Sequence, residues 1–436
     1  MKYKPENENQ NKLNHLKSKP RFEVLDGLRG IAAIIVVSFH IFEIYSKGPD
    51  KQIVNHGYLA VDFFYLLSGF VIGYAYDDRW DKMTYLDFYK RRLIRLHPMI
   101  LAGTFFGVCY YFLSETYFFP NIENVNPYKF LLAVLFSLLN IPTPPCIDIR
   151  GFHESNSLNG AAWTLHYEYL INIIYSLIIR RLHTYIIAII TFISGFLTLT
   201  ITLNFDIFGM LINRDERKYT VIGGWEITSG EVYIAFVRLF YPFFCGYLIS
   251  RLKTTIKIPF SFIGCSIILS IVLCLPRVGG KNWVMNGLYE TVVIILIFPL
   301  IVMIGAGDIE NNDVILKICK FLGEFSYPLY ITHNPVIYCN YAWTYHHQND
   351  PNFNRISVSI GLVIIVFFNT YAAIKLYDEP VRKYLTNKYI IKKKINIENI
   401  VNEKEKNEGK LNIGGIINED EDNNLLKEKL NNDNIE

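Results

Sequence analysis

Apolar blocks of about 15 to 20 residues recur along most of this chain, and they constrain its fold more than any other feature. A membrane segment must pair every backbone N–H and C=O within itself, so blocks of this length indicate membrane-spanning helices. Hydrophobic residues make up 51% of the 436 positions. Basic residues close every second block, which by the positive-inside rule marks the cytoplasmic side. The sequence therefore predicts an all-α bundle of about ten transmembrane helices, with both termini in the cytoplasm.

The expected spans follow one another with few interruptions. They are residues 24–45, 57–76, 99–114, 163–179, 185–203, 232–249, 258–275, 288–304, 321–341 and 356–376. A shorter apolar run at 130–141 falls below the length of a span, so we expect it to be re-entrant or interfacial. Pro328 is expected to break the helix around it. The membrane domain is predicted over 22–389, with a disordered cytoplasmic tail at 1–21 and a disordered polar tail at 390–436.

Several classes of protein fit this sequence poorly. The net charge is +3, and no basic stripe with interleaved aromatic residues suggests nucleic acid. The seven cysteines are scattered without CxxC spacing, which favours small core residues over zinc or disulfide sites. His40 and Glu43 form one intramembrane HxxE pair, but no third ligand lies near them in sequence. We therefore expect no metal and no permanently bound cofactor.

Arg29 and His40 are the most informative polar pair in the first span. They lie eleven positions apart, which is about three helical turns, so both side chains share one face with a rise of about 16 Å. This rise would put Arg29 near one mouth of the membrane and His40 near its midplane. An ionisable residue at that depth is a functional-site hypothesis by default. The alternative is a core histidine hydrogen-bonded to a neighbouring helix.

The segment 77–98 is amphipathic and strongly basic, with Lys90, Arg91, Arg92 and Arg95. The positive-inside rule puts it on the cytoplasmic face. Two interpretations remain open for these charges. They could anchor the topology on anionic lipid, or they could bind a polyanionic cytoplasmic ligand, since clustered guanidiniums suit phosphates.

Further polar residues interrupt the apolar blocks. Asp62 is a buried acid in the second span, and Glu168 follows Trp163 in the block that begins at 161. His166 and Glu168 lie two positions apart, so at most one of them can face the same cavity as His40. The residues at 378–380, Asp-Glu-Pro, are interpreted as a helix stop.

Six segments together resemble the membrane-bound acyltransferase 3 family, over about 22–385. They occur in the family's order, and the residues that carry the resemblance are Arg29 and His40 in FEVLDGLRGIAAIIVVSFH, the segment GYLAVDFFYLLSGFVIGY, Arg91, Arg92, Arg95 and Pro98 in FYKRRLIRLHP, Trp163 and Glu168 in AAWTLHYEY, Ser326, Tyr327, Tyr330 and His333 in FLGEFSYPLYITH, and YDEPVRKYL. The family includes O-acetyltransferases of surface polysaccharides and enzymes that acylate macrolides. Two departures are His166 within the Trp–Glu element and the adjacency of Glu379 and Pro380.

The resemblance implies an O-acyltransferase at the inner or plasma membrane, with acyl-CoA, in the first instance acetyl-CoA, as co-substrate. Its partners would be this donor, the bilayer and a hydroxyl acceptor, which could be a polysaccharide, a lipid-linked sugar, a peptidoglycan unit or a small metabolite. The physical interpretation agrees: Arg29, with Arg91, Arg92 and Arg95, would hold the CoA phosphates. His40 would act as general base on the acceptor hydroxyl or carry the acyl group transiently.

The remaining polar residues are given supporting roles. A carboxylate from Glu168, Asp62 or Glu43 would orient the His40 imidazole, and Glu168 is included among the catalytic residues. The acceptor is expected to contact Asp62, Trp163, Tyr327 and His333. A transporter or exporter of a small polar or glycan substrate is the alternative, because buried polar groups at mid-depth suit that class too. The absence of an evident internal repeat weighs against it, and a structural scaffold would leave the aligned Arg29–His40 pair unexplained.

Overall fold

The computed structural model describes residues 19, 21–46, 51–114, 119, 122–211, 217–277, 283–307, 310, 312–347 and 349–391. Within these residues the regular structure is all-helical, and an isolated β-bridge joins Glu154 and Glu226. The tails predicted at 1–21 and 390–436 fall almost entirely outside the described residues. The limits of the membrane domain therefore stay a prediction, whereas the all-α class is confirmed.

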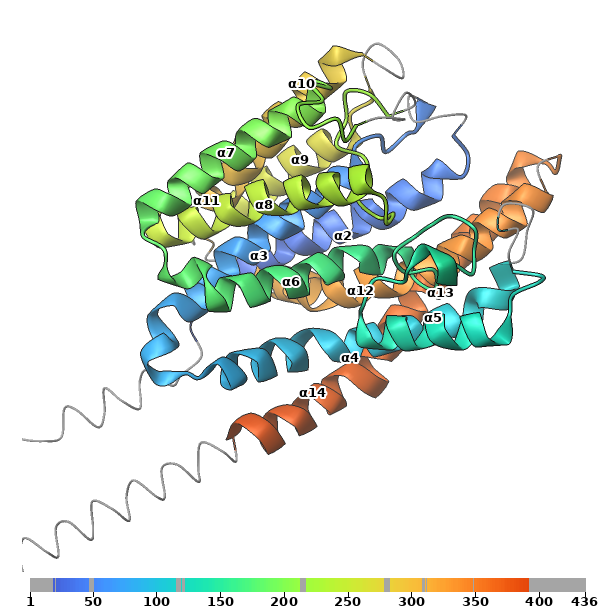
Figure 1. Ribbon diagram of the computed structural model, residues 1–436, viewed down its shortest axis with the longest axis horizontal. Coiled ribbons are helices and arrows are strands. Elements are labelled where there is room, and N and C mark those ends of the chain that lie inside the picture. Colours follow the sequence, from blue (N-terminus) through green and yellow to red (C-terminus); the bar gives the residue numbers. More distant parts are fainter. Residues whose placement is uncertain are drawn as a thin grey trace, which may run out of the picture.

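Most of the helices lie along one common direction (Figure 1). The α-helices are α2 (Glu23–Glu43), α3 (Ala60–Tyr76), α4 (Tyr85–Tyr111), α5 (Pro127–Leu139), α6 (Trp163–Leu177), α7 (Thr184–Thr202), α8 (Ser229–Leu252), α9 (Ser261–Cys274), α10 (Val284–Val292), α11 (Phe298–Gly305), α12 (Asp313–His346), α13 (Asn352–Ala372) and α14 (Glu379–Thr386). The shorter helical segments are η2 (Gly57–Leu59), η3 (Asp77–Lys82), η4 (Phe112–Ser114), η5 (Pro145–Ile147), η6 (Gly160–Ala162), η7 (Ile179–Arg181), η8 (Val293–Ile297), η9 (Ala373–Asp378) and η10 (Asn387–Ile391). Figure 1 shows α2 and α3 between α7, α8 and α9 on one side and α6 and α12 on the other.

Seven helices of the described chain are long and apolar enough to cross a membrane, which makes this a multi-pass membrane protein. They cover residues 23–43, 57–81, 85–114, 184–202, 229–252, 284–305 and 353–390. Two further apolar helices, α5 and α9, have only 13 and 14 residues. The short α5 agrees with the expectation that the run at 130–141 is not a full span. The count of about ten spans and the cytoplasmic location of both ends remain predictions.

The basic segments predicted to be cytoplasmic meet at one end of the bundle. Arg251, at the end of α8, pairs with Asp77 of η3 at 2.8 Å and donates to the Arg180 carbonyl of η7 at 2.9 Å. Arg180 in turn donates to the hydroxyl of Tyr85, the first residue of α4, at 2.9 Å. Residues from three predicted cytoplasmic loops therefore share one end, as the positive-inside rule requires.

Small residues set the closest helix contacts. A Cβ added to Gly69 of α3 would lie 2.0 Å from the Phe243 carbonyl oxygen of α8, and one added to Gly246 of α8 would lie 2.0 Å from the Leu66 carbonyl oxygen. The two backbones touch at reciprocal glycines, which is how membrane helices gain packing without a hydrophobic drive between them.

The prediction that Pro328 breaks its helix is wrong, because α12 runs unbroken from Asp313 to His346 through both Pro328 and Pro335. A proline removes the hydrogen bond to the carbonyl four residues earlier. Within a bundle, a neighbouring segment can supply the missing donor. The carbonyl freed by Pro335 is that of Ile331, and it accepts from Asn159 Nδ2 at 2.7 Å.

Candidate active site

Arg29 lies at a close approach of α2 and α12. A Cβ added to Gly30 would sit 2.6 Å from the Leu322 carbonyl oxygen, and one on Gly323 would sit 2.6 Å from Asp26 Cβ. Because the helices are this close, the Arg29 guanidinium reaches across: Nη2 donates to the Gly323 carbonyl at 3.0 Å and Nε to Ser326 Oγ at 2.8 Å. Asp26, one turn earlier on α2, pairs with Nη2 at 3.1 Å.

His40 lies at the other end of the same interface. Its Nδ1 is 3.2 Å from Glu43 Oε2, and the Tyr341 hydroxyl of α12 donates to that same oxygen at 2.6 Å. The imidazole stacks on that of His333, with ring centroids 5.5 Å apart. Arg29 and His40 therefore both face α12, as the eleven-residue spacing predicts.

The expectation that His40 lies near the membrane midplane does not fit the bounds of α2. The helix begins at Glu23 and ends at Glu43, so His40 is in its last turn, and Arg29 is already in its second. The His40 side chain is 27% exposed, which leaves the imidazole reachable from outside the protein.

The hydrogen bonds assign the tautomers of both stacked histidines. His40 Nδ1–H donates to the Glu43 carboxylate, so Nε2 carries the lone pair. His333 Nδ1–H donates to the Tyr330 carbonyl at 2.7 Å. The buried His333 Nε2 has no hydrogen-bond partner within the described part of the chain. An imidazole held at Nδ1 by a carboxylate is suited to general-base chemistry at Nε2.

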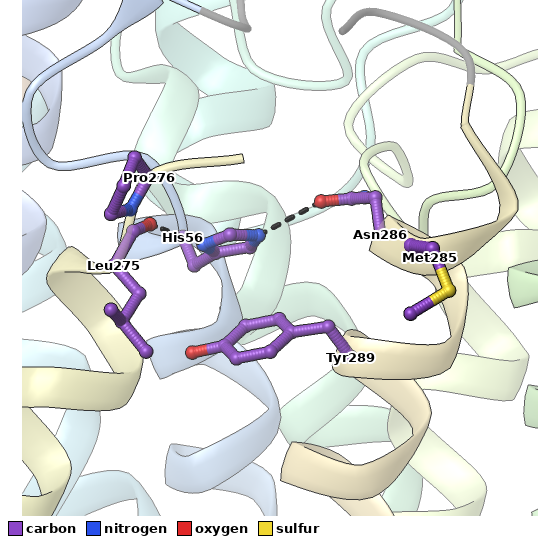
Figure 2. A pocket seen from close by; sticks show the side chains of 6 residues that line it. All are labelled: His56, Leu275, Pro276, Met285, Asn286 and Tyr289. Carbon is purple, nitrogen blue, oxygen red and sulfur yellow. Dashed lines mark hydrogen bonds between the residues drawn. The ribbon is translucent and has the colours of Figure 1, made fainter. Parts of the chain in front are cut away.

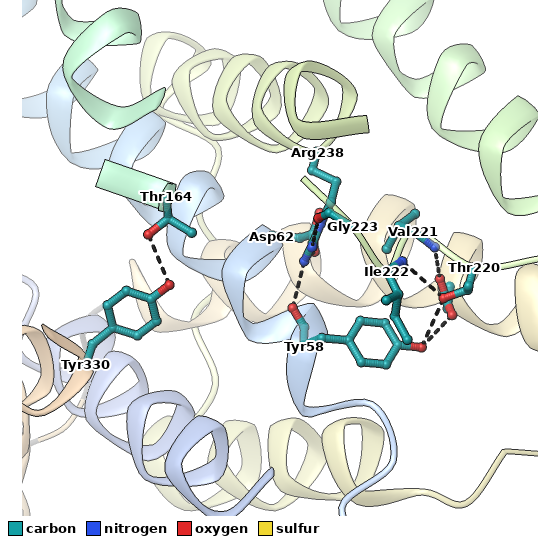
Figure 3. Close-up of polar contacts among 10 residues, drawn as sticks. Tyr58, Asp62, Thr164, Thr220, Val221, Ile222, Gly223, Arg238 and Tyr330 are labelled. Atoms are coloured by element: carbon teal, nitrogen blue, oxygen red, sulfur yellow. Dashed lines mark hydrogen bonds and ion pairs between the residues drawn. The ribbon is translucent and has the colours of Figure 1, made fainter. Parts of the chain in front are cut away.

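Of the three carboxylates considered for orienting His40, Glu43 is the one in contact with it. Glu168 instead binds Arg92 and accepts from Ser68 Oγ at 2.7 Å. Asp62 pairs with Arg238 Nη2 at 2.7 Å (Figure 3). Neither Glu168 nor Asp62 contacts His40 in the described part of the chain, so the orienting role predicted for them stays without support from these contacts. Helical phase within one segment cannot show which partner a neighbouring helix brings to a buried acid.

The four arginines expected to hold CoA phosphates separate into two environments. Arg92 is buried against Glu168, whereas Arg91 and Arg95 are exposed on α4. Arg95 lies within electrostatic reach of both Arg29 and Arg92. A phosphate-binding group of Arg29 and Arg95 at this end of the bundle thus stays a prediction that the geometry allows.

The other predicted acceptor residues are dispersed. Trp163 is buried under the Arg238 guanidinium, whose Cζ is 5.6 Å from the indole centroid. The Tyr327 hydroxyl donates to the Leu96 carbonyl of α4 at 2.7 Å. His333 alone of the four predicted acceptor residues contacts His40, so the roles of Asp62, Trp163 and Tyr327 in acceptor binding stay predictions without support from these contacts.

A family model described as "Acyltransferase domain" matches residues 22–374. The chain belongs to this acyltransferase family. The assignment confirms the family resemblance and makes the protein an acyltransferase by class.

Curated relatives of this acyltransferase agree with that class. Protein 2 in the picA locus of Rhizobium radiobacter is 31% identical over 164 residues, covering 36% of this chain and 81% of that protein. The O-acetyltransferase OatA of Staphylococcus aureus is 24% identical over 377 residues, covering 82% of this chain and 57% of OatA. The peptidoglycan O-acetyltransferase OatA of Listeria monocytogenes is 32% identical over 101 residues, covering 22% of this chain and 14% of that protein. The chain thus spans little more than half of the staphylococcal relative, and no solved structure matches it.

The acyltransferase also contains a buried polar network that the sequence analysis missed (Figure 3). Arg238 of α8 donates to the carbonyls of Gly223 and Tyr58, and the Tyr58 hydroxyl donates to Glu290 at 2.5 Å. The Tyr330 hydroxyl lies 3.0 Å from Thr164 Oγ1, and this hydrogen bond, also drawn in Figure 3, joins two of the family segments. A cation at position 238 inside a predicted span was the available signal.

Tyr341 was missed as well, although it lies eight positions after His333 and can share its broad helix face.

A cavity of about 130 Å³ lies at the end of the bundle opposite the basic loops (Figure 2). Its lining residues are His56, Leu275, Pro276, Met285, Asn286 and Tyr289. His56 bridges two helices there, with Nδ1 2.8 Å from the Leu275 carbonyl oxygen and Nε2 2.9 Å from Asn286 Oδ1. Both ring nitrogens are engaged in these contacts, so His56 ties α9 to α10 and is not free to act as a base.

Proposed function

We propose that this chain moves a short acyl group, acetyl in the first instance, from cytoplasmic acyl-CoA to a hydroxyl of a carbohydrate. Family membership supports O-acyl transfer within a membrane. The carbohydrate acceptor is suggested by the relatives named O-acetyltransferase and peptidoglycan O-acetyltransferase. The observation that carries the proposal is the Glu43–His40 pair, stacked on His333 and placed on the same α2–α12 interface as Arg29.

The arrangement suits base-catalysed acyl transfer. His40 Nε2 takes the proton of the acceptor hydroxyl while the hydroxyl oxygen attacks the thioester carbonyl carbon. The C–S bond then breaks, and the proton passes from His40 to the leaving thiolate of CoA. Glu43 accepts from Nδ1–H throughout, which keeps the productive tautomer and stabilises the imidazolium.

The donor enters from the opposite end of the interface in this proposal. Arg29 and Arg95 would bind its phosphates, because guanidiniums give phosphates paired, charge-assisted hydrogen bonds. The rise from Arg29 to His40 is about 16 Å along the helix. An extended pantetheine arm spans a similar length, so phosphates at Arg29 are compatible with a thioester at His40.

The test uses the full chain purified in detergent or nanodiscs. Thiol release from acetyl-CoA is followed with peptidoglycan fragments and with other sugar acceptors. His40→Ala is expected to lower kcat by about 10²- to 10⁴-fold, the usual contribution of a general base. The matched control is His183→Ala, since His183 is an exposed histidine just before α7. A folded His40→Ala protein with wild-type activity would refute the role of His40, and a wild-type protein that leaves acetyl-CoA intact would refute the donor.

A further inference from the structure

Two loops that lie far apart in the sequence are joined near the His40 end of the α2–α12 interface. An isolated antiparallel β-bridge pairs Glu154, in the loop before α6, with Glu226, in the loop before α8. The Ser155 amide donates to the Trp225 carbonyl at 2.7 Å, which holds the two loops in this register. The carboxylates of Glu154 and Glu226 therefore belong to one structural unit.

Two tyrosines of α12 attach this unit to the His40–Glu43 pair. The Tyr338 hydroxyl donates to Glu154 Oε2 at 2.7 Å, and the Tyr341 hydroxyl donates to Glu43 Oε2 at 2.6 Å. Residues three apart on a helix are neighbours on its surface. Tyr341 accordingly interacts electrostatically with both Glu43 and Glu154. The Glu154 carboxylate thus lies on the side from which an acceptor hydroxyl can reach His40.

Arg217 supplies the positive charge of the joined loops. Its guanidinium lies over the Trp225 indole, with Cζ 4.8 Å from the ring centroid, and it interacts electrostatically with Glu43. Its Nη1 is 3.3 Å from Glu231 Oε1 and 3.5 Å from Glu226 Oε1. Two carboxylates therefore already compensate this cation, which makes it a poor partner for a further anion.

The acceptor rim, defined as Glu154, Arg217 and Glu226, is reachable from solvent, because all three residues are partly exposed. Ionised carboxylates accept hydrogen bonds and donate none, so they pair well with the hydroxyls of an uncharged sugar. A carboxylate on the acceptor would bring a like charge instead. The rim can therefore distinguish acceptors by their charge.

We infer that the acceptor rim binds the sugar that is acylated and selects an uncharged sugar over one that carries a carboxylate. Hydroxyls of the neutral sugar donate to Glu154 and Glu226, while the reacting hydroxyl gives its proton to His40. An anionic sugar would face both carboxylates, and the compensated Arg217 would not offset them. This inference rests on the proposed function, because it names the class of acceptor for the site assumed there.

Two acceptors that differ only in charge test this selection. One is the disaccharide of N-acetylglucosamine and N-acetylmuramic acid, and the other is the same disaccharide with its lactyl carboxylate converted to a carboxamide. The full chain is assayed by thiol release from acetyl-CoA at pH 8, because burial raises the pKa of Glu154 to about 7 and this carboxyl must be ionised. The wild type is expected to show a kcat/KM about three- to tenfold higher for the carboxamide, the effect of one like charge at several ångströms near a protein surface.

Glu226→Gln and Glu154→Gln are the test variants. Each removes one carboxylate, and Glu226→Gln also leaves Arg217 less compensated. Each is expected to raise kcat/KM for the anionic acceptor about three- to tenfold, with little change for the carboxamide. The matched control is Glu123→Gln, which removes an exposed carboxylate from the loop before α5 and should change neither value.

Ionic strength provides a readout that a purely structural role would not move. The Debye length falls from about 10 Å at 0.1 M salt to about 3 Å at 1 M. The preference of the wild type for the carboxamide should therefore shrink at 1 M salt. A preference that persists unchanged would arise from shape and would overturn the selection by charge.

The remaining contrary results separate the inference from the proposed function. Equal kcat/KM values for the two acceptors in the wild type would overturn the inference and leave acyl transfer standing. A preference that survives in both Glu154→Gln and Glu226→Gln would overturn the role of the rim. Faster turnover of the anionic acceptor by the wild type would overturn the inference as well, because Arg217 would then bind the carboxylate. If the wild type releases no thiol with any sugar, the proposed function fails, and the inference fails with it.

Discussion

His40 and His333 stack across the α2–α12 interface, with their ring planes inclined by 30° and their centroids 5.5 Å apart. Each imidazole uses Nδ1 for an oxygen acceptor, and each keeps Nε2 free of such a bond within the described chain. The stack therefore places the His333 imidazole directly beside the proposed base.

His333→Phe tests this pairing. The phenyl ring keeps the stacked aromatic contact but removes Nε2, so we expect kcat to fall about tenfold, less than for His40→Ala. The KM for acetyl-CoA should stay unchanged, because His333 is far along α12 from the Arg29 contacts. A steady-state kcat and KM measurement decides it, and an unaltered kcat would make His333 a packing residue only.

Glu43→Gln tests the orientation of His40. A glutamine amide can donate to Nδ1 and favour the wrong tautomer, so kcat should fall about 10²- to 10⁴-fold. Tyr341→Phe serves as its comparison: it removes the hydrogen bond to Glu43 and leaves the carboxylate in place, so we expect a loss of only a few fold. Equal kcat values in Glu43→Gln and the wild type would mean that His40 needs no carboxylate.

Asp62→Ala tests whether the Asp62–Arg238 pair is structural. The two side chains are 1% and 2% exposed, and removing one partner leaves a buried charge, which costs on the order of 3–5 kcal/mol. Thermal unfolding in detergent should therefore show a lower Tm, and Asp62→Ala combined with Arg238→Met should recover part of it. If the Tm holds while the KM for the acceptor rises, Asp62 belongs to the acceptor site after all.

Glu154 gives the protein a pH-dependent stability. Burial in the loop before α6, with Asp148 and Glu226 nearby, raises the pKa of this carboxyl from 4.5 to about 7. Between these values the folded state binds more protons than the unfolded state, so the free energy of unfolding falls as pH rises. One group contributes at most about 1.4 kcal/mol per pH unit. We expect the Tm to decline from pH 5 to 7 and to flatten in Glu154→Gln; parallel curves for the two proteins would contradict this.

Much of this architecture can be predicted from the sequence, because it depends on patterns within single segments. Apolar block length gives the helices, and the eleven-residue spacing gives the common face of Arg29 and His40. The pairing of Glu168 with Arg92, by contrast, depends on how α4 and α6 rotate against each other. No pattern within either segment contains that rotation, and for this reason Glu168 was assigned to His40.

The two prolines of α12 also show that local sequence cannot predict what neighbouring segments contribute. Pro328 and Pro335 disfavour a helix locally, and an isolated segment would bend or stop there. At Pro335 the bundle overrides this preference because Asn159, from a neighbouring segment, donates to the carbonyl that the proline leaves free. The role of Arg238 could not be predicted in the same way, because its partner Asp62 belongs to a helix that is far away in the sequence. Its charge within an apolar block was nevertheless visible.

The carbonyl that Pro335 sets free has a mechanical consequence. The Asn159 side chain, in the loop that leads into α6, donates a hydrogen bond to this carbonyl. The neighbouring Gly160 amide donates to the Tyr338 hydroxyl, further along α12. The segment that leads into α6 is therefore tied to α12 at two points. A tilt of α12, the helix that bears His333, would move this segment with it.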